Sequence, residues 1–158
     1  MNVKVKICGV TCVSDAVAAA EAGADMIGLM FYERSSRHVP FVTAAEIARE
    51  LPPHVVKVGV FVNPTAEGVE RAMLECGLTL LQFHGDERPE FCTQFGMMSL
   101  KAFRVRDAAS LAALPEYRTD AWLLDAFSPA ALGGTGERFN WELAVDAKKL
   151  GRPIFLAG

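Results

Sequence analysis

The segment Leu78-Thr79-Leu80-Leu81-Gln82-Phe83 is apolar at nearly every position. A strand of this kind has both faces covered, as in a parallel sheet with helices on one side and a filled interior on the other. Stretches of helical period flank it, at about Thr65 to Cys76 before it and Pro89 to Phe95 after it. The segment therefore predicts one strand of a repeated βα unit.

The same alternation extends over the whole chain. Further strands are expected at about Val3 to Ile7, Met26 to Met30, Val55 to Val62, Met98 to Ala102, Ala121 to Asp125 and Pro153 to Ala157. Further helices are expected near Ser14 to Ala22, with Ser14 and Asp15 as N-cap residues, and near Thr43 to Leu51, Asp107 to Leu114 and Trp141 to Leu150. Strand starts recur about every 25 residues. This regularity favours an α/β fold of the TIM (β/α)8 barrel type, and an open flavodoxin-like sheet is the alternative.

Seven expected strands are one fewer than a (β/α)8 barrel requires, and the seventh ends close to Gly158. We therefore expect residues 1–158 to form a single barrel domain that is incomplete at its C-terminus. The part after strand 7 would be missing, at about 40 to 50 residues for one strand and two helices.

Composition narrows the classes of partner. The chain has 158 residues and a net charge of −3, with no long block of either sign, which argues against nucleic acid and anionic membranes. No apolar run approaches the roughly 20 residues that a bilayer-spanning helix needs. The four cysteines form no C-x-x-C pair, so we expect reduced thiols, a cytoplasmic location and no metal site.

Two strand ends carry groups suited to acid/base chemistry, and in barrels of this class function gathers at the carboxyl ends of strands. Cys8 ends the first strand before a turn at Gly9. Its thiol acts as a base only when ionised, and the alternative is a small buried apolar side chain. Asp125 ends the sixth strand after an apolar lead-in, which could favour the protonated carboxyl group of a general acid. The alternative is a loop aspartate that caps the next element.

Other strand ends offer groups that could bind a ligand. Arg37, or Arg34 instead, could hold a carboxylate with two parallel hydrogen bonds, although solvated surface arginines are common. Gln82 and His84 offer an amide and an imidazole after the fourth strand.

A glycine-rich loop follows Asp125. Its small residues Gly133-Gly134-Thr135-Gly136 would allow close approach of a ligand, and Phe139 and Trp141 could form one wall. A flexible connection is the other interpretation.

Taken in order, these segments resemble the phosphoribosylanthranilate isomerase family. The resemblance runs from Lys4 to Gly158 and rests on Lys6-Ile-Cys-Gly-Val-Thr11, Ala22-Gly-Ala-Asp25 with Ile27-Gly28, Ser35-Ser-Arg-His-Val39, Val58-Gly-Val-Phe-Val-Asn63, Leu81-Gln-Phe-His-Gly85, Lys101-Ala-Phe-Arg-Val105, Leu124-Asp125 and Gly133-Gly-Thr-Gly136 through Phe139-Asn-Trp141. Ser36 departs from the family, which often has proline before this arginine.

The resemblance implies an isomerase of tryptophan biosynthesis that performs an Amadori rearrangement without cofactor or metal. It makes Asp125 the general acid and Cys8 the general base, and pairs Arg37 with the anthranilate carboxylate. Gln82, His84 and Gly134 would line the site of a small-molecule phosphosugar substrate, in a monomer or a homodimer.

The phosphate is expected at the loop that begins at Gly158, next to a helix N-terminus. A protein that ends at Gly158 is therefore expected to bind its substrate weakly and to turn over little. Two alternatives stay open. One is another phosphate-binding barrel enzyme of the pathway, which would use Lys or Glu at strand ends. The other is a non-catalytic fragment that needs a partner to complete the barrel.

Overall fold

The computed structural model describes residues 3–126 and 141–157. Its contacts divide the chain into two units, Met1–Gln82 and Phe83–Gly158. Both units follow the strand-then-helix alternation expected from the sequence.

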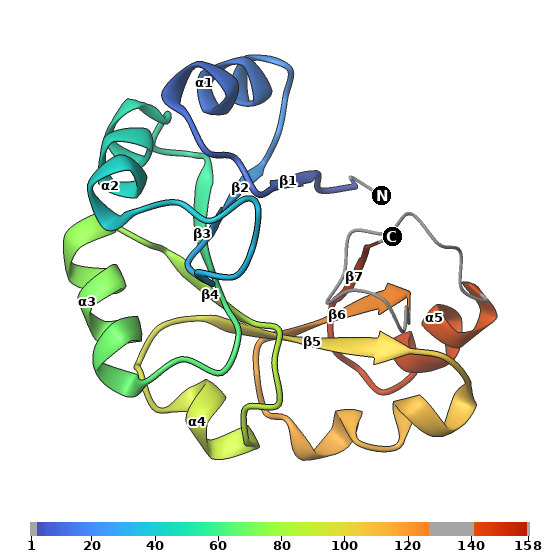
Figure 1. The fold of residues 1–158 in the computed structure, drawn as a ribbon. Coiled ribbons are helices and arrows are strands. Elements are labelled where there is room, and N and C mark those ends of the chain that lie inside the picture. Colours follow the sequence, from blue (N-terminus) through green and yellow to red (C-terminus); the bar gives the residue numbers. More distant parts are fainter. Residues whose placement is uncertain (1–2, 127–140, 158) are drawn as a thin grey trace. The chain divides into compact units, whose positions relative to one another are not determined.

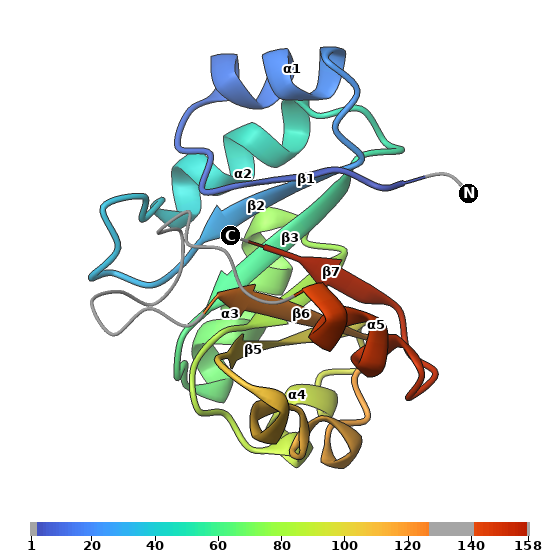
Figure 2. The ribbon, with the colours of Figure 1, turned by 90° about the vertical axis from the view of Figure 1, so that its right-hand side faces the viewer.

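The first unit contains three strands and the three helices that connect them. These are β1 (Lys6–Cys8), α1 (Val13–Glu21), β2 (Met26–Met30), α2 (Phe41–Glu50), β3 (Val56–Phe61) and α3 (Ala66–Cys76), and β4 (Leu80–Phe83) begins in this unit. The strands run parallel, and α1, α2 and α3 lie in a row on one side of them (Figures 1 and 2).

Strand order in this unit decides between two kinds of sheet. β2 pairs with β1 and also with β3, so spatial order follows chain order. A flavodoxin-like sheet would instead place β1 between β2 and β3. The flavodoxin-like alternative is therefore wrong for this unit.

Local sequence explains the borders of α3 and the packing beneath the helices. The side chain of Thr65 caps α3 by accepting a hydrogen bond from the backbone N–H of Gly68 at 3.1 Å, and Gly77 ends it with φ +59°. Ile27 and Leu29 of β2 are fully buried. Each such side chain stabilises the unit by about 1.5 to 3 kcal/mol.

The second unit repeats the pattern with shorter helices. Its elements are α4 (Pro89–Thr93), β5 (Ser99–Val105), the 3-10 turns η1 (Ala108–Leu111) and η2 (Leu114–Glu116), β6 (Ala121–Ala126), α5 (Trp141–Lys148) and β7 (Ile154–Leu156). β6 lies between β5 and β7, parallel to both. The core of this unit contains Val105, Leu114, Trp122, Leu124, Leu143, Ala144 and Ala147.

Two local expectations were wrong. The segment Asp107 to Leu114 forms 3-10 turns rather than an α-helix: η1 ends at Leu111, and η2 begins at Leu114 with Pro115 in its first turn. The N-cap of α1 is Cys12 rather than Ser14 or Asp15, which lie inside the helix, and no side chain caps it.

The seven strands establish a parallel α/β fold within each unit. The expectation of a missing part after strand 7 finds no support in them, since the structure describes the chain only to Ala157.

Candidate active site

The first group of candidate residues gathers where β1 ends. Cys8 is the last residue of β1, and Gly9 follows with φ +82°, a conformation that side chains other than glycine rarely adopt. The backbone N–H groups of Gly9 and Val10 both reach the carbonyl oxygen of Gly28, at 2.9 and 3.3 Å. These bonds fix the turn, so the partly buried Cys8 has a defined backbone.

The thiol of Cys8 lies over a glycine of the neighbouring strand. Cys8 and Gly28 are opposite each other in the β1–β2 register. A β carbon on Gly28 would lie 2.8 Å from Sγ of Cys8 and 3.2 Å from Nζ of Lys6. The missing side chain thus leaves space for the thiol, and it leaves an ammonium group close to it.

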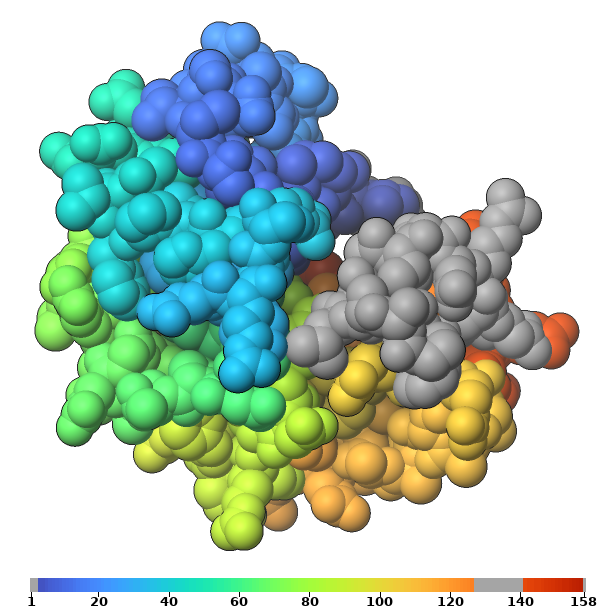
Figure 3. Space-filling model, in the orientation of Figure 1, coloured from blue at the N-terminus to red at the C-terminus, as the bar shows by residue number. Residues whose placement is uncertain are grey.

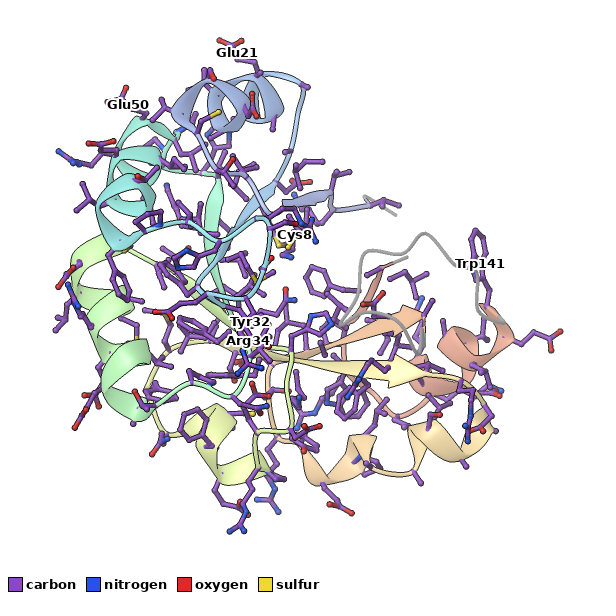
Figure 4. All side chains as sticks on the ribbon, in the orientation of Figure 1. Cys8, Glu21, Tyr32, Arg34, Glu50 and Trp141 are labelled. Atoms are coloured by element: carbon purple, nitrogen blue, oxygen red, sulfur yellow. The ribbon has the colours of Figure 1, made fainter. Side chains whose placement is uncertain are left out.

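Arg37 reaches the same turn from the segment after β2. Its Nη1 donates a hydrogen bond to the carbonyl oxygen of Cys8 at 2.9 Å. Its Cδ lies 2.6 Å from where a β carbon on Gly9 would stand, so only glycine admits this approach. Figure 3 shows this segment in light blue at the surface of the first unit, and Figure 4 shows Cys8 together with Tyr32 and the exposed Arg34.

The second group lies in the other unit, at the end of β6. All six residues of β6 are buried, and Asp125 is its last polar residue. Oδ2 of Asp125 lies 3.3 Å from Nε2 of His84, whose side chain is 11% exposed. The burial expected for Asp125 after its apolar lead-in is therefore present, and an imidazole is its neighbour.

The other expected site residues have different outcomes. Gln82 is buried in β4, as a residue that lines a site would be. Gly134 and Gly158 lie outside the described residues, as does Phe139. Trp141 opens α5 with 70% exposure and points into solvent, so it forms no wall in the second unit (Figure 4).

Sequence reasoning missed Lys6 as a site residue. Side chains two positions apart share one face of a strand, so the position of Lys6 beside Cys8 could have been read from the alternation of β1. It also missed the buried pair of Glu87 and Lys101, whose nitrogen and oxygen are 3.0 Å apart. A glutamate and a lysine 14 residues apart carry no signal of that kind in the sequence.

The remaining cysteines and His54 behave as ordinary structural residues. Burial raises the pKa of Cys76 to about 11 and that of Cys92 to about 12, so both stay protonated thiols near neutral pH. Cys12 is partly exposed and His54 is exposed. Within residues 3–126 and 141–157 there is no cluster of three or more His, Cys, Asp or Glu that could hold a metal ion. None of the helices in those residues has the length and apolar character needed to cross a bilayer.

The two groups suggest complementary chemistry. A thiol near an ammonium group, with a guanidinium on the carbonyl oxygen of the same residue, suits proton abstraction from an anionic ligand. A buried carboxyl group beside an imidazole suits proton donation.

Comparison with known proteins gives one consistent result. The sequence model described as N-(5'phosphoribosyl)anthranilate (PRA) isomerase matches residues 5–158. An N-(5'-phosphoribosyl)anthranilate isomerase of Geobacter sp. (strain M21) is 55% identical over 155 residues, which are 98% of this chain and 76% of the relative. The phosphoribosyl anthranilate isomerase structure from Thermotoga maritima superposes with a TM-score of 0.92 at 35% identity, over 99% of this chain and 77% of that one.

A further structure of the enzyme was solved in complex with reduced 1-(o-carboxyphenylamino)-1-deoxyribulose 5-phosphate. It superposes with a TM-score of 0.86 at 33% identity, over 98% of this chain and 75% of that one.

Proposed function

Because the chain belongs to the N-(5'-phosphoribosyl)anthranilate isomerase family, we propose that Cys8 and Asp125 are the base and the acid of that isomerisation. The enzyme converts N-(5'-phosphoribosyl)anthranilate into 1-(2-carboxyphenylamino)-1-deoxyribulose 5-phosphate in tryptophan biosynthesis. The family match also decides against a different phosphate-binding barrel enzyme.

The reaction needs two proton transfers of opposite direction. Asp125 donates a proton to the ring oxygen as the C1'–O bond of the furanose breaks, which leaves an iminium ion at C1'. Cys8, as its thiolate, removes the proton at C2'. The electron pair of that C–H bond forms a C1'=C2' double bond, and the π pair of the C=N bond moves to the nitrogen. The resulting enaminol tautomerises to the ketone. One group must therefore begin protonated and the other ionised.

The observation that carries the acid assignment is the pair of Asp125 and His84. Asp125 is 3% exposed, and the other residues of β6 are buried as well. Once the proton has left, a buried carboxylate needs a polar partner, and Nε2 of His84 stands 3.3 Å away.

The base assignment rests on the surroundings of Cys8. Cationic neighbours stabilise a thiolate, and the ammonium group of Lys6 is adjacent to the space that the thiol occupies. The exposed side chain of Arg37 would hold the anthranilate carboxylate while one of its N–H groups stays on the carbonyl oxygen of Cys8.

Several finer features belong to the same proposal. We propose that the strands belong to a (β/α)8-type barrel in one domain. Gln82, His84 and Gly134 would contact the substrate, and the loop at Gly158 would contribute to phosphate binding. A cytoplasmic location and a monomeric or homodimeric state also remain predictions.

The direct test is substitution of each group in the full chain. Cys8→Ala and Asp125→Asn should each lower kcat by about 100-fold or more, because each removes one proton transfer. Circular dichroism and the melting temperature should stay close to those of the unchanged protein. Cys12→Ala is the matched control and should keep its turnover, whereas normal turnover in either of the first two variants would remove the corresponding role.

A further inference from the structure

A buried ion pair lies beside the loop that carries His84. Nζ of Lys101, in β5, is 3.0 Å from Oε2 of Glu87, and the two side chains are only 3% and 2% exposed. Two charges removed from water are tolerated only where further hydrogen bonds satisfy them. The partners that supply those bonds therefore indicate what the pair holds in place.

Those partners are the backbone groups around His84. The N–H of Gly85 donates to both carboxylate oxygens of Glu87, at 3.1 and 3.0 Å. Nζ of Lys101 donates to the carbonyl oxygen of Gly85 at 2.6 Å and reaches that of Phe83 at 3.5 Å. The ion pair thus forms hydrogen bonds with the backbone on both sides of His84.

A tyrosine closes this network from the segment before β6. The hydroxyl of Tyr117 donates to the carbonyl oxygen of Glu87 at 3.0 Å, and burial raises the pKa of Tyr117. Nζ of Lys101 also lies 5.7 Å from the ring centroid of Tyr117 and 5.8 Å from that of Phe103. Glu87 is therefore held at its backbone as well as at its carboxylate.

The pair cannot act on Asp125 directly. In the β5–β6 register Arg104 is opposite Asp125, so these two share one face of the sheet. Lys101 is three positions from Arg104 and projects from the other face, because side chains alternate along a strand. Any influence of Lys101 on Asp125 must pass through the backbone of His84.

We propose that Glu87 and Lys101 are positioning residues that fix the imidazole of His84 against the carboxyl group of Asp125. The proposal rests on the proposed role of Asp125 as the acid. An ion pair that anchors both neighbours of one residue leaves that residue little freedom to rotate or shift. Proton transfer is sensitive to such shifts, since a misplacement of about 1 Å can cost about 100-fold in rate.

The first test is Glu87→Gln, which removes the carboxylate charge that accepts the hydrogen bonds from the N–H of Gly85. We expect kcat to fall by about tenfold or more, because the imidazole of His84 is no longer held in place against Asp125. The ring signals of His84 should move in NMR spectra. The chain has only two other histidines, His38 and His54, whose signals should stay in place.

A second variant separates positioning from stability. Glu87→Gln alone leaves a buried lysine uncompensated and will lower the melting temperature, whereas Glu87→Gln with Lys101→Met replaces the pair by neutral side chains and should recover stability. The double variant also loses the bonds from Lys101 to the carbonyl oxygens of Phe83 and Gly85, so kcat should stay low. Recovery of kcat together with stability, with His84 ring signals at their original positions, would overturn the proposal.

Two controls complete the experiment. Glu75→Gln breaks the exposed pair of Arg71 and Glu75 in α3 and should leave kcat unchanged. Asp125→Asn tests the proposed function separately. If that variant kept its turnover, the acid assignment would fail, and the ring signals of His84 would still report whether the ion pair holds the imidazole.

Discussion

Nη1 of Arg37 donates a hydrogen bond to the carbonyl oxygen of Cys8 across 2.9 Å, although the two residues are 29 positions apart. The proposed clamp for the substrate carboxylate and the proposed base are therefore joined through the backbone. A substitution at Arg37 should therefore also alter the position of the Cys8 backbone.

Arg37→Ala should lower kcat/KM by about 10- to 100-fold, because a hydrogen bond to a charged group contributes about 1.5 to 3 kcal/mol. Steady-state kinetics should show most of this loss in KM, since a substrate carboxylate is held before and during the reaction. Arg34→Ala is the matched control on the same segment and should change kcat/KM little. A larger effect at Arg34 than at Arg37 would reassign the clamp.

Gly9→Ala should harm the protein in two ways, through its positive φ and through a clash with Arg37. Gly23→Ala is a close control, since Gly23 has φ +96° but no atom within 4 Å of an added β carbon. Both variants should lose about 1 kcal/mol or more of unfolding free energy in urea titrations. Only Gly9→Ala should also lower kcat/KM. Equal kcat/KM in the two variants would mean that the close approach of Arg37 to Gly9 does not matter for activity.

Lys6→Met should lower kcat, because it removes the ammonium group beside the proposed base. The rate of alkylation of Cys8 by iodoacetamide at pH 7 should fall as well, since only the thiolate reacts. Mass spectrometry of the Cys8 peptide measures this rate site by site. Lys4→Met, which removes an exposed lysine paired with Asp25, should leave alkylation of Cys8 unchanged. An unchanged rate in Lys6→Met would show that its ammonium group does not act on the thiol.

Asp25 gives a prediction about pH and stability. Hydrogen bonds from Nζ of Lys4 and from the backbone N–H of Val5 hold the pKa of Asp25 below its usual value. A carboxyl group of lowered pKa stabilises the folded state above the unfolded pKa of about 3.9, and this contribution is lost as the pH falls through the lowered value. Asp25→Asn should therefore be less stable than the unchanged protein at pH 7, and the difference should shrink as the pH falls below about 4.

Urea unfolding at pH 7, 4 and 3 measures this difference. Glu50→Gln, at the exposed C-terminal end of α2, is a control in which no such loss is expected. A difference for Asp25→Asn that does not vary with pH would mean that the carboxylate charge is irrelevant to its contacts.

Regular elements with strong local signals were predictable from the sequence. β2 has the predicted bounds, because one apolar run stands between turn residues. β5 extends to Val105 beyond the predicted end at Ala102, since pairing with β6 supports the polar Arg104 that the pattern treated as loop. The segment before Pro115 has a helical composition but forms two short 3-10 turns, which the composition alone did not distinguish from an α-helix.

The candidate site was predictable where it depends on the position of a residue along its strand. Asp125 follows an apolar run and ends it, so its burial could be inferred. The partners of such a residue could not, because they come from other strands. Neither the approach of His84 to Asp125 nor the anchoring of Gly85 by Glu87 and Lys101 has a counterpart in sequence spacing. Long charged side chains usually indicate surface, and only spatial pairing reveals the exception.

The absence of a side chain at Gly28 predicts which mutations of the gene should abolish or lower activity. The thiol of Cys8 keeps its place because one methyl group is absent from an adjacent strand. A single-base change that converts this glycine codon to alanine would displace the thiol of Cys8, and we expect it to lower activity although every ionisable group is kept. A screen for auxotrophic mutants should thus recover lesions at codon 28 alongside those at codon 8, whereas a survey confined to polar residues would overlook them.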